Sequence, residues 1–369
     1  MQSNPLFNTF NKLASIYSPS FDERELCDAL KALLSPLGVS FEEDTIQGGS
    51  CGNLFGRLAG ELNGEPILLS SHMDTVEPAR GKQAILHEDG RITSDGTTIL
   101  GADNISGICI ILEALRRIRE AGTPHRSVEL LFPVAEERYG AGSALFDYSK
   151  VKAHTAFVLD LSGEIGTAAN AAPTIFSFEI TAAGKASHSG LAPQNGINAI
   201  TAVASAISKL SWGEPEQGLT ANIGLIKGGE LGNIIPALCS VTGEIRSLNH
   251  NAVLKHWQRV KATFEQEAEK IGATPEFTFK TEITAYETPM DSTAVKLFKK
   301  ACEKSGITAG IHPTLGGSDN NNFALHGIEG LVLACSMHEV HSVREYALLQ
   351  ELEQCTELLI NILTEEEAK

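Results

Sequence analysis

Histidine and carboxylate side chains recur in this sequence beside short apolar runs, and their types suit metal binding. The residues concerned are His72, Asp74, Asp103, Glu136, Glu137, Asp160 and His341. Imidazole nitrogens combined with carboxylate oxygens, without a thiolate, suit a catalytic zinc pair that keeps open coordination positions. Two ions about 3.5–4 Å apart need a shared ligand, and one aspartate can bridge them through its two oxygens. Such a pair would make hydroxide available from water near neutral pH.

Local spacing gives neighbouring residues complementary tasks. Residues two apart in an extended segment face the same way, so Asp74 can hydrogen-bond His72 and fix its tautomer. Adjacent residues face opposite ways, so one of Glu136 and Glu137 can bind metal while the other acts as a general base.

Each of these residues also has an ordinary structural explanation. The His72–Asp74 pair can lie on the surface, and the adjacent glutamates can be solvated. Asp103 can cap the helix that follows it, and Asp160 can open a turn. All four explanations would have to hold together for the site to be absent, so the shared placement favours a metal site.

That placement follows from strands that alternate with helices. Apolar runs at 66–71, 128–134 and 156–160 predict buried strands, and apolar residues at 108, 111, 112, 115 and 118 predict a helix over 105–120. The alternation predicts an α/β fold with a doubly wound sheet. Ligands bind beyond the carboxyl ends of strands in such sheets, which is where the candidate residues collect.

The pattern changes after residue 172. Strands at 174–181, 221–226, 239–246 and 276–284 and helices at 196–210 and 251–271 follow the order β-α-β-β-α-β, which is the ferredoxin-like arrangement. We therefore expect an inserted α+β domain over 173–285 and a first domain built from 1–172 and 286–369. A helix over 292–305, a strand over 330–335 and a terminal helix over 345–363 complete that domain.

Composition excludes several classes of function. The net charge of −17, from 46 acidic and 29 basic residues, disfavours binding to nucleic acid or an anionic membrane surface. The sequence shows no signal peptide and no run long enough to span a bilayer. Seven scattered cysteines without a CxxC pair argue against a disulfide framework, so we expect a cytoplasmic protein.

Six segments resemble the di-zinc metallopeptidase family that includes peptidase T, carboxypeptidase G, aminoacylase and succinyl-diaminopimelate desuccinylase. They are Ser71-His-Met-Asp-Thr-Val, Gly101-Ala-Asp-Asn-Ile-Ser-Gly, Ala135-Glu-Glu, Val158-Leu-Asp, Ala186-Ser-His-Ser-Gly and Met337-His-Glu-Val-His-Ser. The resemblance spans nearly the whole chain. It implies a zinc-hydrolase domain that cleaves amide bonds, with an inserted domain that serves as lid and dimerisation surface.

The resemblance also divides the ligands between two Zn²⁺ ions per subunit, in sites that Co²⁺ or Mn²⁺ can also fill. His72, Asp103 and Asp160 would bind one ion. Asp103 would bridge to a second ion completed by Glu137 and His341. His338 competes with His341, and we prefer His341 because residues 342–345 have the pattern of a capping box that would open the last helix and fix its backbone.

Further roles follow from the same resemblance. Asp74 would orient His72, and Glu136 would activate water and later protonate the leaving amine. Asp160, where other branches have glutamate, indicates the peptidase T-like branch. Asn104 replaces the second aspartate of the usual motif, which alters the charge behind the ligands without removing one.

Residues of the inserted domain are implicated in substrate binding. His188 matches a histidine that reaches the active site of the neighbouring subunit and stabilises the tetrahedral oxyanion, so we expect a homodimer through this domain. Asn233 and Arg246 resemble substrate-contacting positions, and arginine suits a peptide carboxylate. A structural ion pair is the close second alternative for Arg246, because it lies on a predicted strand. Gly317 and Ser318 lie in the segment that resembles the family's glycine-rich substrate loop, and the asparagines at 320–322 have no interpretation.

The resemblance implies hydrolysis of short peptides as the favoured activity, with removal of the N-terminal residue from tripeptides. An N-acyl amino-acid amidohydrolase or a carboxypeptidase would use the same zinc pair and base. A metal-binding relative without catalysis is the alternative of another class.

Overall fold

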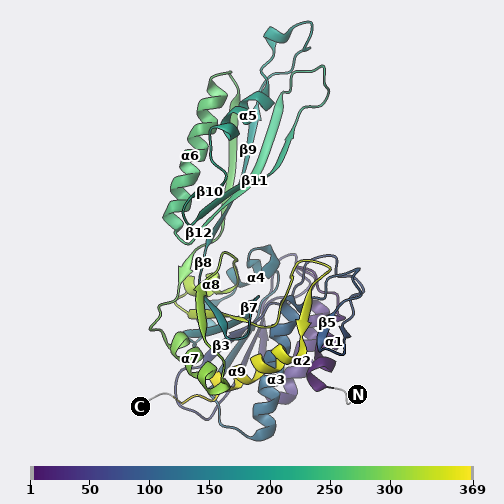
Figure 1. Ribbon diagram of the computed structural model, residues 1–369, viewed down its shortest axis with the longest axis vertical. Helices are drawn as coiled ribbons and strands as arrows, with labels where there is room; N and C mark the ends of the chain where they lie inside the picture. Colours follow the sequence, from purple (N-terminus) through teal and green to yellow (C-terminus); the bar gives the residue numbers. More distant parts are fainter. Residues whose placement is uncertain (1–3, 367–369) are drawn as a thin grey trace. The chain divides into compact units, whose positions relative to one another are not determined.

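The computed structural model describes residues 4–366, which divide into two compact units (Figure 1). The first unit comprises the described residues up to Ala171, Glu287–Thr314 and the described residues from Ser318 onward. The second consists of Ala172–Tyr286 together with Leu315–Gly317. Each has its own hydrophobic core.

A mixed sheet forms the centre of the first unit. Its strands run in the order β1 (Ser40–Glu43), β2 (Leu54–Leu58), β6 (Val128–Phe132), β3 (Ile67–Ser70), β7 (Thr155–Leu161), β16 (Glu329–Ala334), β8 (Thr167–Ala172) and β14 (Tyr286–Glu287), with β15 (Gly310–Pro313) beside β8. The four central strands β6, β3, β7 and β16 are parallel. Parallel strands are buried on both faces, which accounts for their continuous apolar runs.

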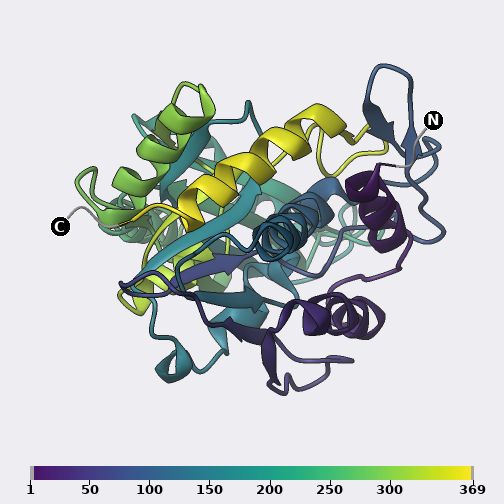
Figure 2. The same ribbon diagram turned by 90° about the horizontal axis from the view of Figure 1, so that it is seen from below.

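Helices cover both faces of this sheet. The principal core lies beneath α1 (Pro5–Ala14), α2 (Arg24–Leu34), α3 (Ala102–Ala121), α7 (Thr293–Ser305) and α9 (Leu349–Leu363), with α3 and α9 packed together (Figure 2). The opposite face packs against the region of α4 (Ala141–Ala144) and α8 (Asn320–Leu325). In β3, Ile67 and Leu69 enter the first core and Leu68 the second. This two-sided burial confirms the predicted doubly wound α/β domain.

Short elements complete the first unit. The strands β4 (Ile85–Leu86), β5 (Arg91–Thr93) and β17 (Tyr346–Leu348) form a small separate sheet. The 3-10 helices are η1 (Ser35–Leu37), η2 (Glu136–Arg138) and η3 (Tyr148–Lys150). None of the helices in the described chain is long and apolar enough to cross a membrane.

The second unit has the ferredoxin-like arrangement that the sequence predicts. Its elements are β9 (Thr174–Ala183), η4 (Pro193–Asn195), α5 (Ala199–Ser208), β10 (Gly213–Glu216), β11 (Leu219–Gly228), β12 (Leu238–Ser247), α6 (His250–Glu269) and β13 (Thr274–Ile283). The antiparallel sheet has the order β10-β11-β12-β9-β13, so β10 is an addition at one edge. Both α5 and α6 pack on the sheet, and Trp257 of α6 lies in the core with Phe176 and Phe178.

The predicted start of the last helix is wrong. Residues Tyr346–Leu348 pair with β5 as a strand, so α9 begins at Leu349. The capping box is also absent, because Ser342 Oγ accepts from Arg344 N and Glu345 turns into the interior. A pattern of four residues cannot reveal that the glutamate has distant backbone partners.

We expect Trp257→Ala to lower the free energy of unfolding by about 3–5 kcal/mol, because it empties the centre of the second core. The matched control is Leu254→Ala on the same helix, where the side chain is 38% exposed. The control should change stability by less than about 0.5 kcal/mol. Urea denaturation followed by circular dichroism measures both, and equal losses would contradict the assigned core.

Candidate metal centre

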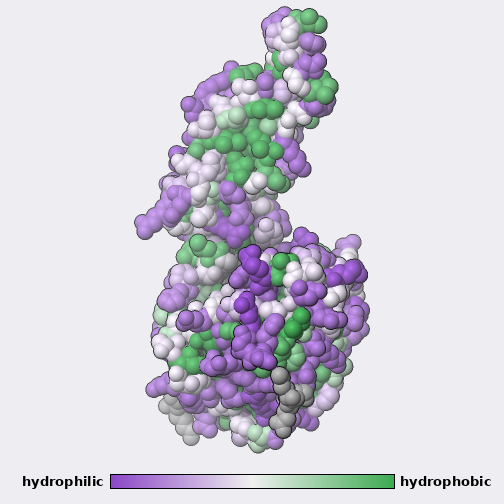
Figure 3. All heavy atoms as spheres, turned by 45° about the vertical axis from the view of Figure 1, so that its right-hand side comes forward, coloured by the Kyte–Doolittle hydropathy of each residue, from purple (hydrophilic) through white to green (hydrophobic). Residues whose placement is uncertain are grey.

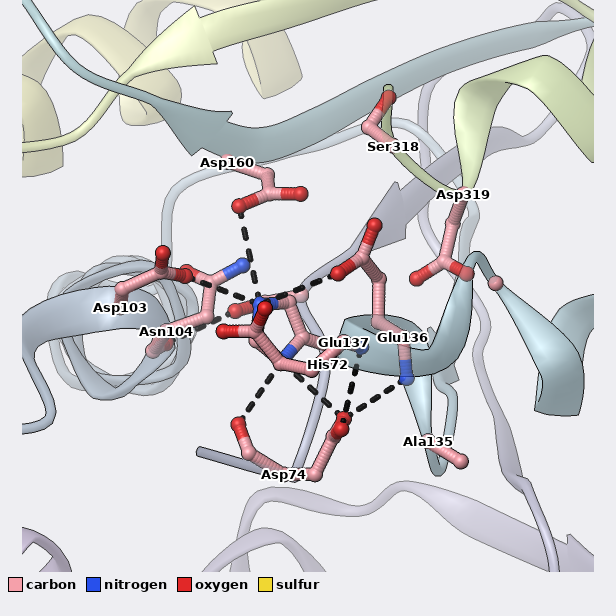
Figure 4. A network of polar contacts seen from close by, with 12 residues as sticks. His72, Asp74, Asp103, Asn104, Ala135, Glu136, Glu137, Asp160, Ser318 and Asp319 are labelled. Atoms are coloured by element: carbon pink, nitrogen blue, oxygen red, sulfur yellow. Dashed lines mark hydrogen bonds and ion pairs between the residues drawn. The ribbon is translucent and has the colours of Figure 1, made fainter. Parts of the chain in front are cut away.

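The side chains expected to bind metal come together in the first unit, at the carboxyl ends of its central strands (Figure 4). His72 follows β3, Glu136 and Glu137 lie in η2 after β6, and Asp160 lies near the end of β7. Two further segments meet these three neighbouring strands. They carry Asp103, at the start of α3, and His341, between β16 and β17.

Asp103 lies between the two histidines. Its Oδ1 is 3.0 Å from His72 Nε2, and its Oδ2 is 3.3 Å from His341 Nε2. His341 Nε2 is also 3.0 Å from Glu137 Oε1. The two oxygens of one carboxylate thus face two different imidazole nitrogens, which is the arrangement required of a ligand that bridges two ions.

The first histidine has a second group of acids around it. His72 Nε2 lies 3.7 Å from Asp160 Oδ1 and 4.0 Å from Glu136 Oε2. Ligand atoms of His72, Glu136 and Asp160 lie within 4.8 Å of one another, as do those of His72, Asp103 and Glu137. The donors can therefore be grouped around His72 in more than one way. Among the acids within residues 4–366, only Asp103 lies within 4.0 Å of both histidines.

Burial of so many acids strongly perturbs their ionisation. Burial, with the nearby charge of Asp160, raises the pKa of Glu136 well above its usual value. Burial also raises the pKa of Asp160 to about 7. Both shifts express the cost of placing several anions in a dehydrated space.

The pKa values of the two histidines also rise, which favours their charged form. Burial opposes protonation of His72, but the carboxylates of Asp103, Asp160 and Asp74 raise its pKa well above the usual value. Hydrogen bonds to Asp103 and Glu137 raise the pKa of His341 to about 10. The pocket thus favours positive charge, and this donor set of imidazole nitrogens and carboxylate oxygens fits divalent metal ions.

Asp74 does more than orient His72. His72 Nδ1 lies 2.9 Å from the backbone oxygen of Asp74 and 3.3 Å from its Oδ1, which directs Nε2 toward the other acids. The same buried carboxylate accepts hydrogen bonds from the backbone N–H groups of Glu136 (2.8 Å) and Glu137 (3.1 Å). It therefore positions the glutamate segment as well as the histidine.

Two residues near the N-terminus support this arrangement, and sequence reasoning missed both. Ser20 Oγ donates to Asp74 Oδ2 at 2.7 Å. Glu23 is fully buried, and its Oε1 accepts from Ala135 N at 2.9 Å. Ala135 has a left-handed backbone (φ 52°), a costly conformation for a residue with a side chain that surrounding contacts must maintain. No spacing pattern connects residues 20 and 23 with residue 135.

A further buried acid, Asp319, lies beside Glu136 (Figure 4). Its Oδ1 is 2.5 Å from Ser143 Oγ, and burial raises its pKa to about 6. Asn322 Nδ2 donates to Ser143 Oγ and to the backbone oxygen of Gly140, while Asn321 Oδ1 accepts from Ser318 N. These contacts give the asparagine run a function, since it fixes the loop that carries Ser318 and Asp319.

His341 and His338 have different surroundings. His338 Nε2 lies 2.6 Å from Glu351 Oε2 and the ring stacks on Tyr346, so this histidine is engaged away from the acids. His341 instead contacts Asp103 and Glu137. The preference for His341 relied on a capping box that the structure does not contain.

The remaining residues singled out by sequence lie in the second unit. His188 is exposed, and its Nδ1 accepts from Gly190 N and Leu191 N. Asn233 lies on the adjacent loop, where its backbone oxygen accepts from Ser189 N.

Arg246 forms two hydrogen bonds with Glu244 and one with the backbone oxygen of Leu315. The ion pair considered from sequence is therefore present. Leu315–Gly317 belongs to the same unit, and Gly317 is exposed beside Ile283.

Comparisons with known proteins agree with this architecture. The family described as Peptidase dimerisation domain (M20_dimer) matches residues 170–272, and Peptidase family M28 matches residues 53–203. Aminopeptidase PepT from Bacillus cereus has a similar structure, with 34% identity, 97% of each chain covered and a TM-score of 0.91. A tripeptidase from Staphylococcus aureus is 29% identical over 97% of each chain, with a TM-score of 0.95. The uncharacterised protein YqjE of Bacillus subtilis is 35% identical over 98% of each chain.

These similarities, together with the histidine and carboxylate donors of the α/β unit, identify the protein as a metallopeptidase. The chain belongs to the M20 peptidase family. A dinuclear metal-binding M20 peptidase from Bacillus subtilis, 18% identical over 97% of this chain and 96% of its own, shares the fold with a TM-score of 0.73.

We expect Asp74→Asn to weaken metal binding about 10- to 100-fold, because the amide NH2 group would replace one of the two oxygens that accept from Glu136 N and Glu137 N. The buried N–H group left without a partner should also lower stability by about 1–3 kcal/mol. Calorimetric metal titration and urea denaturation measure the two effects. The exposed control Asp95→Asn should leave metal affinity unchanged, and an equal loss in both variants would argue against the role of Asp74.

Proposed function

We propose that this metallopeptidase is a cytoplasmic di-zinc aminopeptidase that removes the N-terminal residue from short peptides, tripeptides above all. The observation that carries the proposal is the Asp103 carboxylate between His72 and His341. Whole-length similarity to aminopeptidase PepT and to a tripeptidase supports the substrate class. The seven cysteines, all free thiols, are consistent with a reducing compartment.

In this proposal, His72, Asp103 and Asp160 would hold one zinc ion, and Asp103, Glu137 and His341 would hold the other. When bound, the ions would polarise the scissile carbonyl and make water acidic enough to react near neutral pH. Co²⁺ or Mn²⁺ would support the same chemistry, since the donors are nitrogen and oxygen atoms.

Glu136 serves as the general base in this mechanism. Its carboxylate takes a proton from the attacking water and then delivers it to the leaving amine nitrogen as the amide bond breaks. The hydrogen bond from Glu136 N to Asp74 keeps the backbone of this residue in place during both steps. Asn233, Arg246, Gly317 and Ser318 are the proposed contacts to the peptide.

The proposed assembly is a homodimer through the inserted domain, with residues 173–285 as lid and dimerisation domain and 1–172 with 286–369 as catalytic domain. β10 pairs with β11 only around Ala221 and Leu219, so the outer half of β11 extends beyond it. Leu225 and Ile226 are 58% and 55% exposed there, and Figure 3 shows apolar surface on this unit. An open apolar strand edge favours pairing with a second copy.

The first test combines a peptide panel with Glu136→Gln. Wild-type protein should hydrolyse tripeptides with a free N-terminus faster than dipeptides or N-acetylated peptides. Glu136→Gln should retain two metal ions per chain and lose about 10²- to 10⁴-fold in kcat. Activity confined to N-acylated substrates would contradict the aminopeptidase, and equally poor hydrolysis by both proteins would identify a non-catalytic metal-binding relative.

The second test asks whether His188 acts on the partner subunit's site. His188→Ala and Glu136→Gln should each be nearly inactive, yet subunits mixed by mild unfolding and refolding should recover about one quarter of wild-type activity. Half of the random dimers would be mixed, and each would contain one site with an intact Glu136 and an intact His188. Mixtures that remain inactive while forming dimers would show that His188 does not act across the interface.

A further inference from the structure

Glu345 makes an unusual set of contacts behind the proposed bridging ligand. Its side chain is 1% exposed and lies in the segment between His341 and β17. Oε2 accepts from Leu100 N at 2.8 Å and from Gly101 N at 2.7 Å, and Oε1 accepts from Asp103 N at 2.9 Å. One carboxylate therefore binds three backbone N–H groups of the segment that presents Asp103.

These N–H groups need an acceptor from outside their own helix. The first N–H groups of a helix have no partner within it. Here the entry is irregular as well, because Gly101 has a left-handed backbone (φ 79°) and Asp103 and Asn104 have non-helical dihedral angles. No side chain caps α3 locally. A distant glutamate thus fixes the position of the Asp103 backbone, and with it the two carboxylate oxygens that face the histidines.

A buried cation accompanies this glutamate. Lys82 is 1% exposed, and Nζ donates to Thr75 Oγ1 at 3.4 Å. A side-chain carbon on Gly101 would lie 2.9 Å from Lys82 Nζ, so the ammonium packs directly against the segment that Glu345 holds. Burial lowers the pKa of Lys82 to about 8, and the charge of Glu345 opposes that shift. The electrostatic interaction with Glu345 therefore favours the charged form of Lys82.

The location of Glu345 also links two ligands. It lies four positions after His341 in the chain, and His341 Nε2 is 3.3 Å from Asp103 Oδ2. His341 has a left-handed backbone (φ 59°), so its loop depends on outside contacts to keep its shape. The contacts of Glu345 join this loop to the start of α3. His72 and Asp160, by contrast, are placed by the central strands β3 and β7.

We propose that Glu345 is a positioning residue for the metal centre, which with Lys82 holds Asp103 and the His341 loop in register so that the second metal site forms. The inference rests on the proposed function, because it takes Asp103 to be shared by two ions. It assigns Glu345 no contact with substrate or metal. Its loss should therefore affect the ion held by Glu137 and His341 more than the ion held by His72 and Asp160.

The test is metal binding to full-length Glu345→Gln. In calorimetric titration with Mn²⁺ or Zn²⁺, we expect one of the two binding events to lose about 10- to 100-fold in affinity, with the other event changed less than about threefold. With two equivalents of Mn²⁺, the exchange-coupled electron paramagnetic resonance signal of wild type should give way to the signal of isolated ions. These readouts do not require turnover.

The matched control is Glu351→Gln. It removes a partner of His338 in the same region but has no hydrogen bond to residues 100–103 in the described structure. The control should keep both affinities and the coupled signal. If Glu345→Gln also keeps both, whatever its stability, Glu345 is only a structural residue and the inference is overturned. A wild-type protein that binds a single ion would instead contradict the proposed function.

Lys82→Met tests the positioning role if Glu345→Gln does not fold. This variant keeps all three hydrogen bonds to Glu345 but removes the buried positive charge beside it. We expect the binding event that Glu345→Gln would weaken to lose about 10-fold in affinity, at the lower end of the range for residues behind metal ligands. Unchanged affinity for both ions in a folded Lys82→Met protein would overturn the inference.

Discussion

Both oxygens of Asp103 face a histidine, and the geometry of the rest of the site depends on where that carboxylate lies. Its position is set by backbone contacts, since three N–H groups at the entry of α3 converge on Glu345. Asp74 does the same for the N–H groups of Glu136 and Glu137. Buried carboxylates therefore hold the segments that present other carboxylates.

This arrangement concentrates negative charge in a dehydrated pocket. Burial raises the pKa of Glu136 and Asp160, while neighbouring acids raise the pKa of His72 and His341. Divalent cations would relieve the repulsion between the acids and restore their ionised forms. The repulsion between these acids thus favours metal binding. The proposed base, Glu136, lies within the same group of side chains, 4.0 Å from His72 Nε2.

Much of the fold could be predicted because its signals are local. Continuous apolar runs reveal strands buried on both faces, and the β-α-β-β-α-β order reveals the ferredoxin-like unit. The approximate location of the site followed from the carboxyl ends of β3, β6 and β7. The strand β17 was missed because three residues of unremarkable composition form a strand only through pairing with β5.

The residues that support the metal centre could not be predicted, because their contacts are also with residues distant in the sequence. Glu345 had the spacing of a helix cap, and only the folded chain shows that its partners are at residues 100, 101 and 103. Glu23, Lys82 and Asp319 are buried charges, which composition alone places on the surface. Sequence therefore indicates the candidate metal ligands, whereas the residues that hold those ligands in place depend on long-range contacts.

X-ray absorption at the zinc edge of protein loaded with two equivalents of Zn²⁺ would show whether Asp103 bridges two ions. A centre built around Asp103 should give nitrogen and oxygen ligands at about 2.0–2.2 Å and no sulfur at about 2.3 Å. The zinc–zinc distance should be about 3.5–4 Å, because one carboxylate would bridge the ions. A sulfur shell, or two bound ions without a zinc–zinc contribution, would contradict a centre built around Asp103.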